Sequence, residues 1–101
     1  MKPIEPPLPS LVSGKWYLLN VRAKKRESFI KYLKITIAKN KLDKVFLDIK
    51  VPQDYVYGDI VLVNLTNFKI ADTYLQKIDY FQSIERKPLP LEQVSRMIGN
   101  Q

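Results

Sequence analysis

The sequence has 101 residues, of which 46% are hydrophobic, and 17 Lys and Arg against 10 Asp and Glu give a net charge of +7. This length suits one domain, and the hydrophobic content is too high for a disordered chain. Cysteine and histidine are both absent. The chain therefore has no disulfide and no thiolate metal site, and it lacks histidine, the commonest general base of enzymes. We expect a protein that is not an enzyme and that uses neither a metal nor another cofactor.

The positive charge is concentrated in the first half of the chain. Residues 15–50 carry 11 basic and 3 acidic side chains, whereas residues 51–101 carry 5 and 6. Such a region attracts anionic partners, nucleic acid above all, although a solvated helix face explains the charge equally well. No segment approaches the roughly 20 apolar residues that span a membrane, and residues 1–14 lack the apolar run of a signal peptide. We therefore expect a cytoplasmic protein that makes no membrane contact.

The first half of the chain predicts a tail, a strand and a helix. Residues 1–14 are rich in proline, which indicates a flexible, extended tail before a single domain at residues 15–101. Residues 15–22 have the aromatic and branched side chains of a central strand. Residues 24–40 have the apolar spacing of a helix. The strand has two alternating faces, one with Trp16, Leu18 and Asn20 and the other with Tyr17, Leu19 and Val21. The helix has one apolar stripe, which consists of Phe29, Ile30, Leu33, Ile37 and Ala38.

The second half predicts three more strands and two helices. Apolar and polar residues alternate at 44–51 and predict a strand that ends at Pro52. Residues 53–56 are expected to connect it to the next strand, at residues 60–65. A helix capped by Asn67 or Thr66 precedes a strand at 80–84, a rigid link at 87–90 and a last helix at 91–98 that Gly99 stops. The order β-α-β-β-α-β predicts an α+β fold with a four-stranded antiparallel sheet backed by helices. The inner sides of the two helices are expected to be Ile70, Ala71, Tyr74, Leu75 and Ile78, and Val94, Met97 and Ile98.

The same topology occurs in RNA-recognition motifs, which expose aromatic side chains on their middle strands to stack bases. Residues 60–63 of this chain are Ile-Val-Leu-Val, so this strand is aliphatic on both faces. The glycine–aromatic pattern of those motifs is also missing. The topology fits that family, but the chemistry does not.

Four segments carry a resemblance to another family of this topology. They are Lys-Trp-Tyr-Leu-Leu at 15–19, Val-Pro at 51–52, Tyr57 with Val-Leu-Val at 61–63, and Lys-Pro-Leu-Pro-Leu at 87–91. In this order and spacing, the chain resembles the N-terminal (NGN) domain of NusG-type transcription elongation factors over roughly residues 15–98. It contains no counterpart of the family's KOW domain.

The resemblance implies an RRM-like or NGN-like fold and a non-enzymatic transcription elongation or antitermination factor. Family members dock an apolar depression of the sheet onto the clamp helices of the largest RNA polymerase subunit. Some also contact non-template DNA through basic residues near the first helix. By position, polymerase contact falls on Trp16, Asn20, Tyr57, Ile60 and Leu62, and contact with DNA or RNA falls on Arg22, Lys24, Lys25 and Arg26.

The chain departs from the family pattern before the third strand. The family's Phe-Pro-Gly-Tyr is here Tyr-Gly-Asp-Ile at 57–60, and the charged loop before it is short. Two alternatives therefore stay open. One is a small basic RNA- or DNA-binding module that does not depend on polymerase. The other is a docking surface for an unrelated protein.

Overall fold

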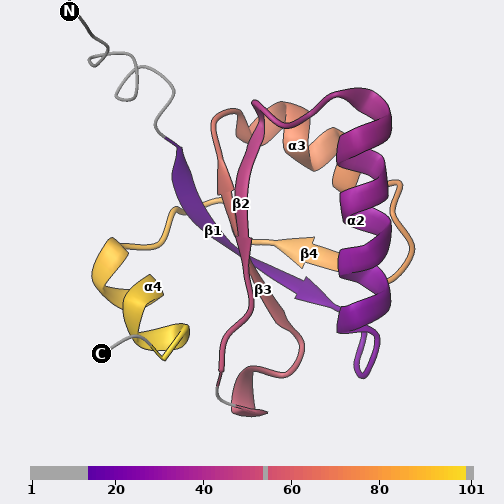
Figure 1. Ribbon diagram of the computed structural model, residues 1–101. Helices are drawn as coiled ribbons and strands as arrows, with labels where there is room; N and C mark the ends of the chain where they lie inside the picture. Colours follow the sequence, from indigo (N-terminus) through magenta and orange to yellow (C-terminus); the bar gives the residue numbers. More distant parts are fainter. Residues whose placement is uncertain (1–13, 54, 100–101) are drawn as a thin grey trace, which may run out of the picture.

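The structure, a computed structural model, describes residues 14–53 and 55–99, so all but Gly14 of the tail predicted at residues 1–14 lies outside the described residues. Within them, the strands form one antiparallel four-stranded sheet in the order β2-β3-β1-β4 (Figure 1). The predicted α+β fold and its order of elements are confirmed. The elements are β1 (Lys15–Val21), α2 (Arg26–Asn40), β2 (Phe46–Lys50), the 3-10 helix η1 (Tyr55–Tyr57), β3 (Ile60–Leu65), α3 (Phe68–Leu75), β4 (Phe81–Ile84) and α4 (Leu91–Met97).

The main core lies between one face of the sheet and helices α2 and α3. Leu19 of β1 and Phe29 and Leu33 of α2 are fully buried there. Burying each of these side chains contributes about 1.5–3 kcal/mol relative to leaving it exposed. Tyr17 and Val21 flank Leu19 on this face, so the alternation predicted for the first strand is confirmed. The central position of β1, between β3 and β4, is confirmed as well.

A smaller cluster covers part of the opposite face, where α4 packs (Figure 1). Leu62 of β3 is buried against Val94 and Met97 of α4, with Trp16 half-buried beside them. The link before α4 is fixed to the sheet because the Leu89 N–H donates to the Trp16 carbonyl at 2.8 Å. The inward positions predicted for Val94 and Met97 are confirmed, and Ile98, the residue after α4, is half-buried against the same cluster.

Helix α2 begins two residues later than predicted. Lys24 has a left-handed φ of 65°, and Lys25 is the N-cap without a side-chain hydrogen bond to the helix. The helix ends as Lys41 turns left-handed at its C-cap. Ala38 is exposed, so its predicted place on the buried stripe is wrong. Ile37, one residue earlier, is the last residue of α2 that packs against the core.

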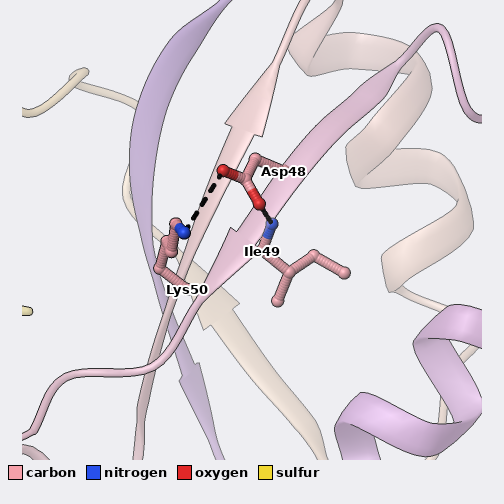
Figure 2. Close-up of polar contacts among 3 residues, drawn as sticks. All are labelled: Asp48, Ile49 and Lys50. Atoms are coloured by element: carbon pink, nitrogen blue, oxygen red, sulfur yellow. Dashed lines mark hydrogen bonds and ion pairs between the residues drawn. The ribbon is translucent and has the colours of Figure 1, made fainter.

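Strand β2 contains a bulge that the predicted alternation missed. Phe46 pairs with Leu65 and Asp48 with Asn64, which leaves Leu47 as an extra residue that is 40% exposed. The shift moves Phe46 onto the core face in place of Leu47. Figure 2 shows Asp48 at this point, where its carboxylate accepts a 2.8 Å hydrogen bond from its neighbour's backbone N–H and lies 3.8 Å from the ammonium of Lys50. A bulged edge strand with charged side chains resists pairing with another chain.

The segments on either side of β3 differ in how well the sequence predicted them. The expected connector at 53–56 instead enters η1. Asn67 caps α3 as predicted, with its side-chain oxygen accepting from the Ile70 N–H at 3.0 Å. Ile70 itself is 41% exposed, so its predicted inward position is wrong. Ile78 is buried, but it lies in the turn after α3, which ends at Leu75.

No helix in the described part of the chain is both long and apolar enough to cross a bilayer.

Candidate functional site

Four of the five residues predicted for polymerase contact lie on the sheet face that carries α4; the fifth, Tyr57, lies in η1. The register between β1 and β3 pairs Leu18 with Leu62 and Asn20 with Ile60. Trp16, Asn20 and Ile60 are half-buried on this face. Leu62 is fully buried among the residues beneath α4. Leu62 is therefore part of the packing beneath α4 and presents no surface to a partner in this conformation.

Tyr57 is the most exposed aromatic side chain of the predicted set. It ends η1 and keeps 37% of its surface exposed. Its side of the molecule is hollowed, with Tyr57 and the α4 residues Gln93, Arg96 and Met97 around a space of about 330 Å³. Gln93 and Arg96 give this hollow polar side chains on its α4 side. A partly exposed tyrosine beside a hollow has the character of an interface anchor.

Arg26 holds the turn that carries Tyr57. One guanidinium nitrogen donates to the carbonyl of Tyr57 at 2.8 Å and to that of Ile60 at 3.2 Å. The same turn is tied to β1 by the Val21 N–H, which donates to the Asp59 carbonyl at 3.0 Å. Arg26 was predicted to contact nucleic acid, but part of its hydrogen-bonding capacity is used inside the protein. It joins the first turn of α2 to the candidate docking face.

The other predicted basic residues lie in the turn between β1 and α2. Arg22, Lys24 and Lys25 are all exposed there. The Lys25 ammonium lies 5.3 Å from the ring centroid of Tyr80, and the Arg22 backbone N–H donates to the Tyr80 carbonyl at 2.8 Å. This turn is therefore connected to the residue that precedes β4. An ammonium over a tyrosine ring is a favourable cation–π geometry.

Sequence reasoning missed a pair of tyrosines beside this basic turn. The rings of Tyr32 and Tyr80 are stacked, with centroids 6.1 Å apart and planes 22° from parallel. Tyr32 lies on the outside of α2 and is 38% exposed, and Tyr80 has a left-handed φ of 76°. A hollow of about 240 Å³ lies beside Tyr32, with Lys77 on its wall. The sequence signal for this pair was Tyr32, an aromatic residue one position away from the apolar stripe of a basic helix.

Among residues 14–53 and 55–99, no three side chains of the metal-ligating types lie close enough together to hold an ion.

No protein-family model matches the chain, and none of the curated proteins compared with it matches its sequence.

Proposed function

We propose that the protein is a non-enzymatic transcription factor that docks on the clamp helices of RNA polymerase through the face around Trp16, Asn20, Tyr57 and Ile60. It acts in elongation or antitermination, in the cytoplasm where polymerase works. The observation that carries the proposal is Tyr57, a partly exposed aromatic residue beside a hollow. The two hydrogen bonds from Arg26 hold the turn that carries Tyr57 in one conformation. This preorganisation reduces the entropy lost when the turn binds a partner.

The shape of this face suits a helical partner. Half-buried apolar side chains from β1 and β3 lie along one side of α4, and the Tyr57 hollow lies at its end. Apolar anchors in a groove are how proteins commonly bind amphipathic helices. The resemblance in the 15–19, 51–52 and 87–91 segments supports clamp helices as that partner.

The test is capture of purified core RNA polymerase by the immobilised protein. Tyr57→Ala removes the anchor and is expected to reduce capture strongly, since anchor residues contribute about 2 kcal/mol or more. Ile60→Asp places a charge on the same face and is expected to abolish capture. Its matched control is Ile70→Asp, the same substitution at an exposed position on α3. Equal capture by the wild type and Tyr57→Ala would contradict the proposal.

A second candidate function is binding of nucleic acid by the basic turn and the tyrosine pair. Arg22, Lys24 and Lys25 provide positive charge, and the Tyr32–Tyr80 pair lies directly beside them. Cations that follow a backbone and aromatic rings that stack on bases are together the elements of a single-strand binding surface. This function is compatible with docking, because the surface is on the α2 side of the fold.

Its test is fluorescence anisotropy with a labelled single-stranded oligonucleotide at increasing salt. Electrostatic binding predicts an affinity that falls steeply with salt and is lost in the Lys24→Glu, Lys25→Glu variant. Tyr32→Ala is expected to weaken binding by about 1–3 kcal/mol while polymerase capture stays intact. Tyr57→Ala is the reciprocal control, since it leaves the basic turn unchanged. Undetectable binding at low salt would rule out this function.

A further inference from the structure

The hollow beside Tyr32 has the size of a pocket for one nucleobase. Its volume is about 240 Å³, below the roughly 300–1,000 Å³ of pockets that hold drug-sized ligands. Two elements line it: Tyr32, Ile35 and Thr36 belong to α2, and Lys77, Ile78 and Asp79 belong to the turn after α3. The ring of Tyr32 also stacks with Tyr80, which carries the ammonium of Lys25 over its own ring. A base in the hollow would therefore lie next to the basic turn.

Asp79 presents an exposed carboxylate at this hollow. Aspartates in turns usually accept hydrogen bonds from nearby backbone N–H groups, as Asp48 does in β2. In the part of the chain that the structure describes, the Asp79 side chain makes no hydrogen bond and no ion pair. A negative charge beside a basic turn also opposes the attraction of phosphate. What this carboxylate can supply is acceptor oxygens for the donor groups of a base.

The polar groups of the hollow match the Watson–Crick edge of guanine. Both oxygens of an ionised carboxylate are acceptors only. Guanine presents its N1–H and its N2 amine side by side, whereas adenine and cytosine place a ring acceptor next to their amine. Thymine and uracil have a single N–H between two carbonyls. Thr36 and Lys77 line the same hollow and are donors for the remaining guanine group, the O6 acceptor. Among the common bases, guanine alone pairs with both carboxylate oxygens.

We propose that this hollow binds a guanine base of a single-stranded nucleic acid, with Asp79 accepting from N1–H and from the N2 amine. Tyr32 packs against the base, and the exposed cations of the basic turn hold the neighbouring phosphates. The inference rests on the second function proposed above, binding of single strands, and adds the base that the surface selects. Pairing with both carboxylate oxygens favours guanine by about tenfold or more in affinity.

The experiment measures the anisotropy of labelled oligothymidylates that differ only in one central base. A central guanine is expected to bind about tenfold more tightly than a central adenine, and inosine, which lacks the N2 amine, should lose most of this preference. Asp79→Asn is expected to abolish the preference, whereas the all-thymine strand should bind at least as tightly because a negative charge is gone. The matched control is Asp59→Asn, the same change at an exposed position in the Tyr57 turn, which should keep the preference.

Equal affinity for the guanine and adenine strands would overturn the inference and leave single-strand binding in place, whereas no binding of any strand would overturn both. A guanine preference that survives in Asp79→Asn would also overturn it, because another group would then read the base. Guanosine monophosphate that binds as tightly as the guanine strand would do the same, since the ligand would then be a free nucleotide. Far-ultraviolet circular dichroism should be the same for both variants, because both side chains are exposed.

Discussion

Arg26 connects the α2 side of the molecule to the turn that carries Tyr57. Arg26→Lys keeps the charge but shortens the side chain and removes the guanidinium nitrogen that donates to both carbonyls. We expect a loss of about 1–2 kcal/mol in the free energy of unfolding, measured by urea denaturation. Arg22→Lys, at an exposed position, should change it by less than about 0.5 kcal/mol. Equal losses in the two variants would show that the two hydrogen bonds contribute nothing specific.

Gly14 is required by the close approach of its backbone to β3. An alanine at this position would collide with the Asn64 side chain and crowd the Leu65 carbonyl. We expect Gly14→Ala to lower the free energy of unfolding by about 1–3 kcal/mol, measured by thermal denaturation. Truncating the neighbour in Gly14→Ala, Asn64→Ala makes room and should recover part of the loss. Strictly additive effects of the two substitutions would contradict this direct contact.

The two longer helices begin in opposite ways. Asn67 caps α3 with its side chain, whereas Lys25, at the N-cap of α2, makes no such hydrogen bond. Asn67→Ala should therefore lower the free energy of unfolding by about 1 kcal/mol, and Asn67→Ser should restore most of it because serine is also a good cap. Chemical denaturation measures both. An alanine variant as stable as the serine variant would show that the cap is dispensable.

The absence of a cap on α2 fits a functional use of that end. A cation at the positive end of the helix dipole is unfavourable, and Lys25 stands there over the ring of Tyr80. The left-handed φ of Tyr80 places a second uncommon conformation at the same spot. Residues held in uncommon backbone conformations cluster at binding sites. A bound phosphate would relieve the charge at this end.

Much of the fold followed from the sequence because most of the elements have a clear apolar period. The strand at 15–21 alternates between two faces, and the Asn67 cap marks a helix start that the structure confirms. The bulge at Leu47 could not be predicted, because it depends on which of two adjacent apolar residues fits under α2. Nor could η1, which forms in a segment without apolar periodicity.

The candidate site was less predictable than the fold. Its residues were assigned by resemblance to a family, and their contacts join segments far apart in the sequence. Arg26 reaches a carbonyl 31 residues away, and the stacked tyrosines belong to different elements. Local patterns do not encode such pairs, because side-chain direction and long-range packing decide them. Leu62 shows the same limit, since burial under α4 could not be read from an aliphatic strand.

At the scale of the whole molecule, the sheet separates the two candidate surfaces. The basic turn and the tyrosine pair lie with α2, and the apolar face lies with α4 across the sheet (Figure 1). A polymerase on one side and a nucleic acid on the other can therefore bind together. The concentration of positive charge in residues 15–50 favours fast association with the anionic partner.

The small cluster under α4 has a consequence for the dynamics of the fold. Leu62, Val94 and Met97 are its buried members, whereas the main core is several times larger. Sub-global opening has the lowest free energy where few apolar contacts must break. We expect native-state hydrogen exchange to show α4 amides exchanging through such openings, well below the stability of β1 and β3. Exchange of α4 only with global unfolding would contradict this.

Each opening of α4 would expose Leu62 for a short time. A partner that binds only the opened state would add Leu62 to its contact surface, and its observed affinity would be reduced by the small population of that state. Substitutions at the α4 interface would then change partner affinity without touching the partner. The equilibrium between the closed and the opened position of α4 would thus set how much apolar surface the sheet offers to a partner.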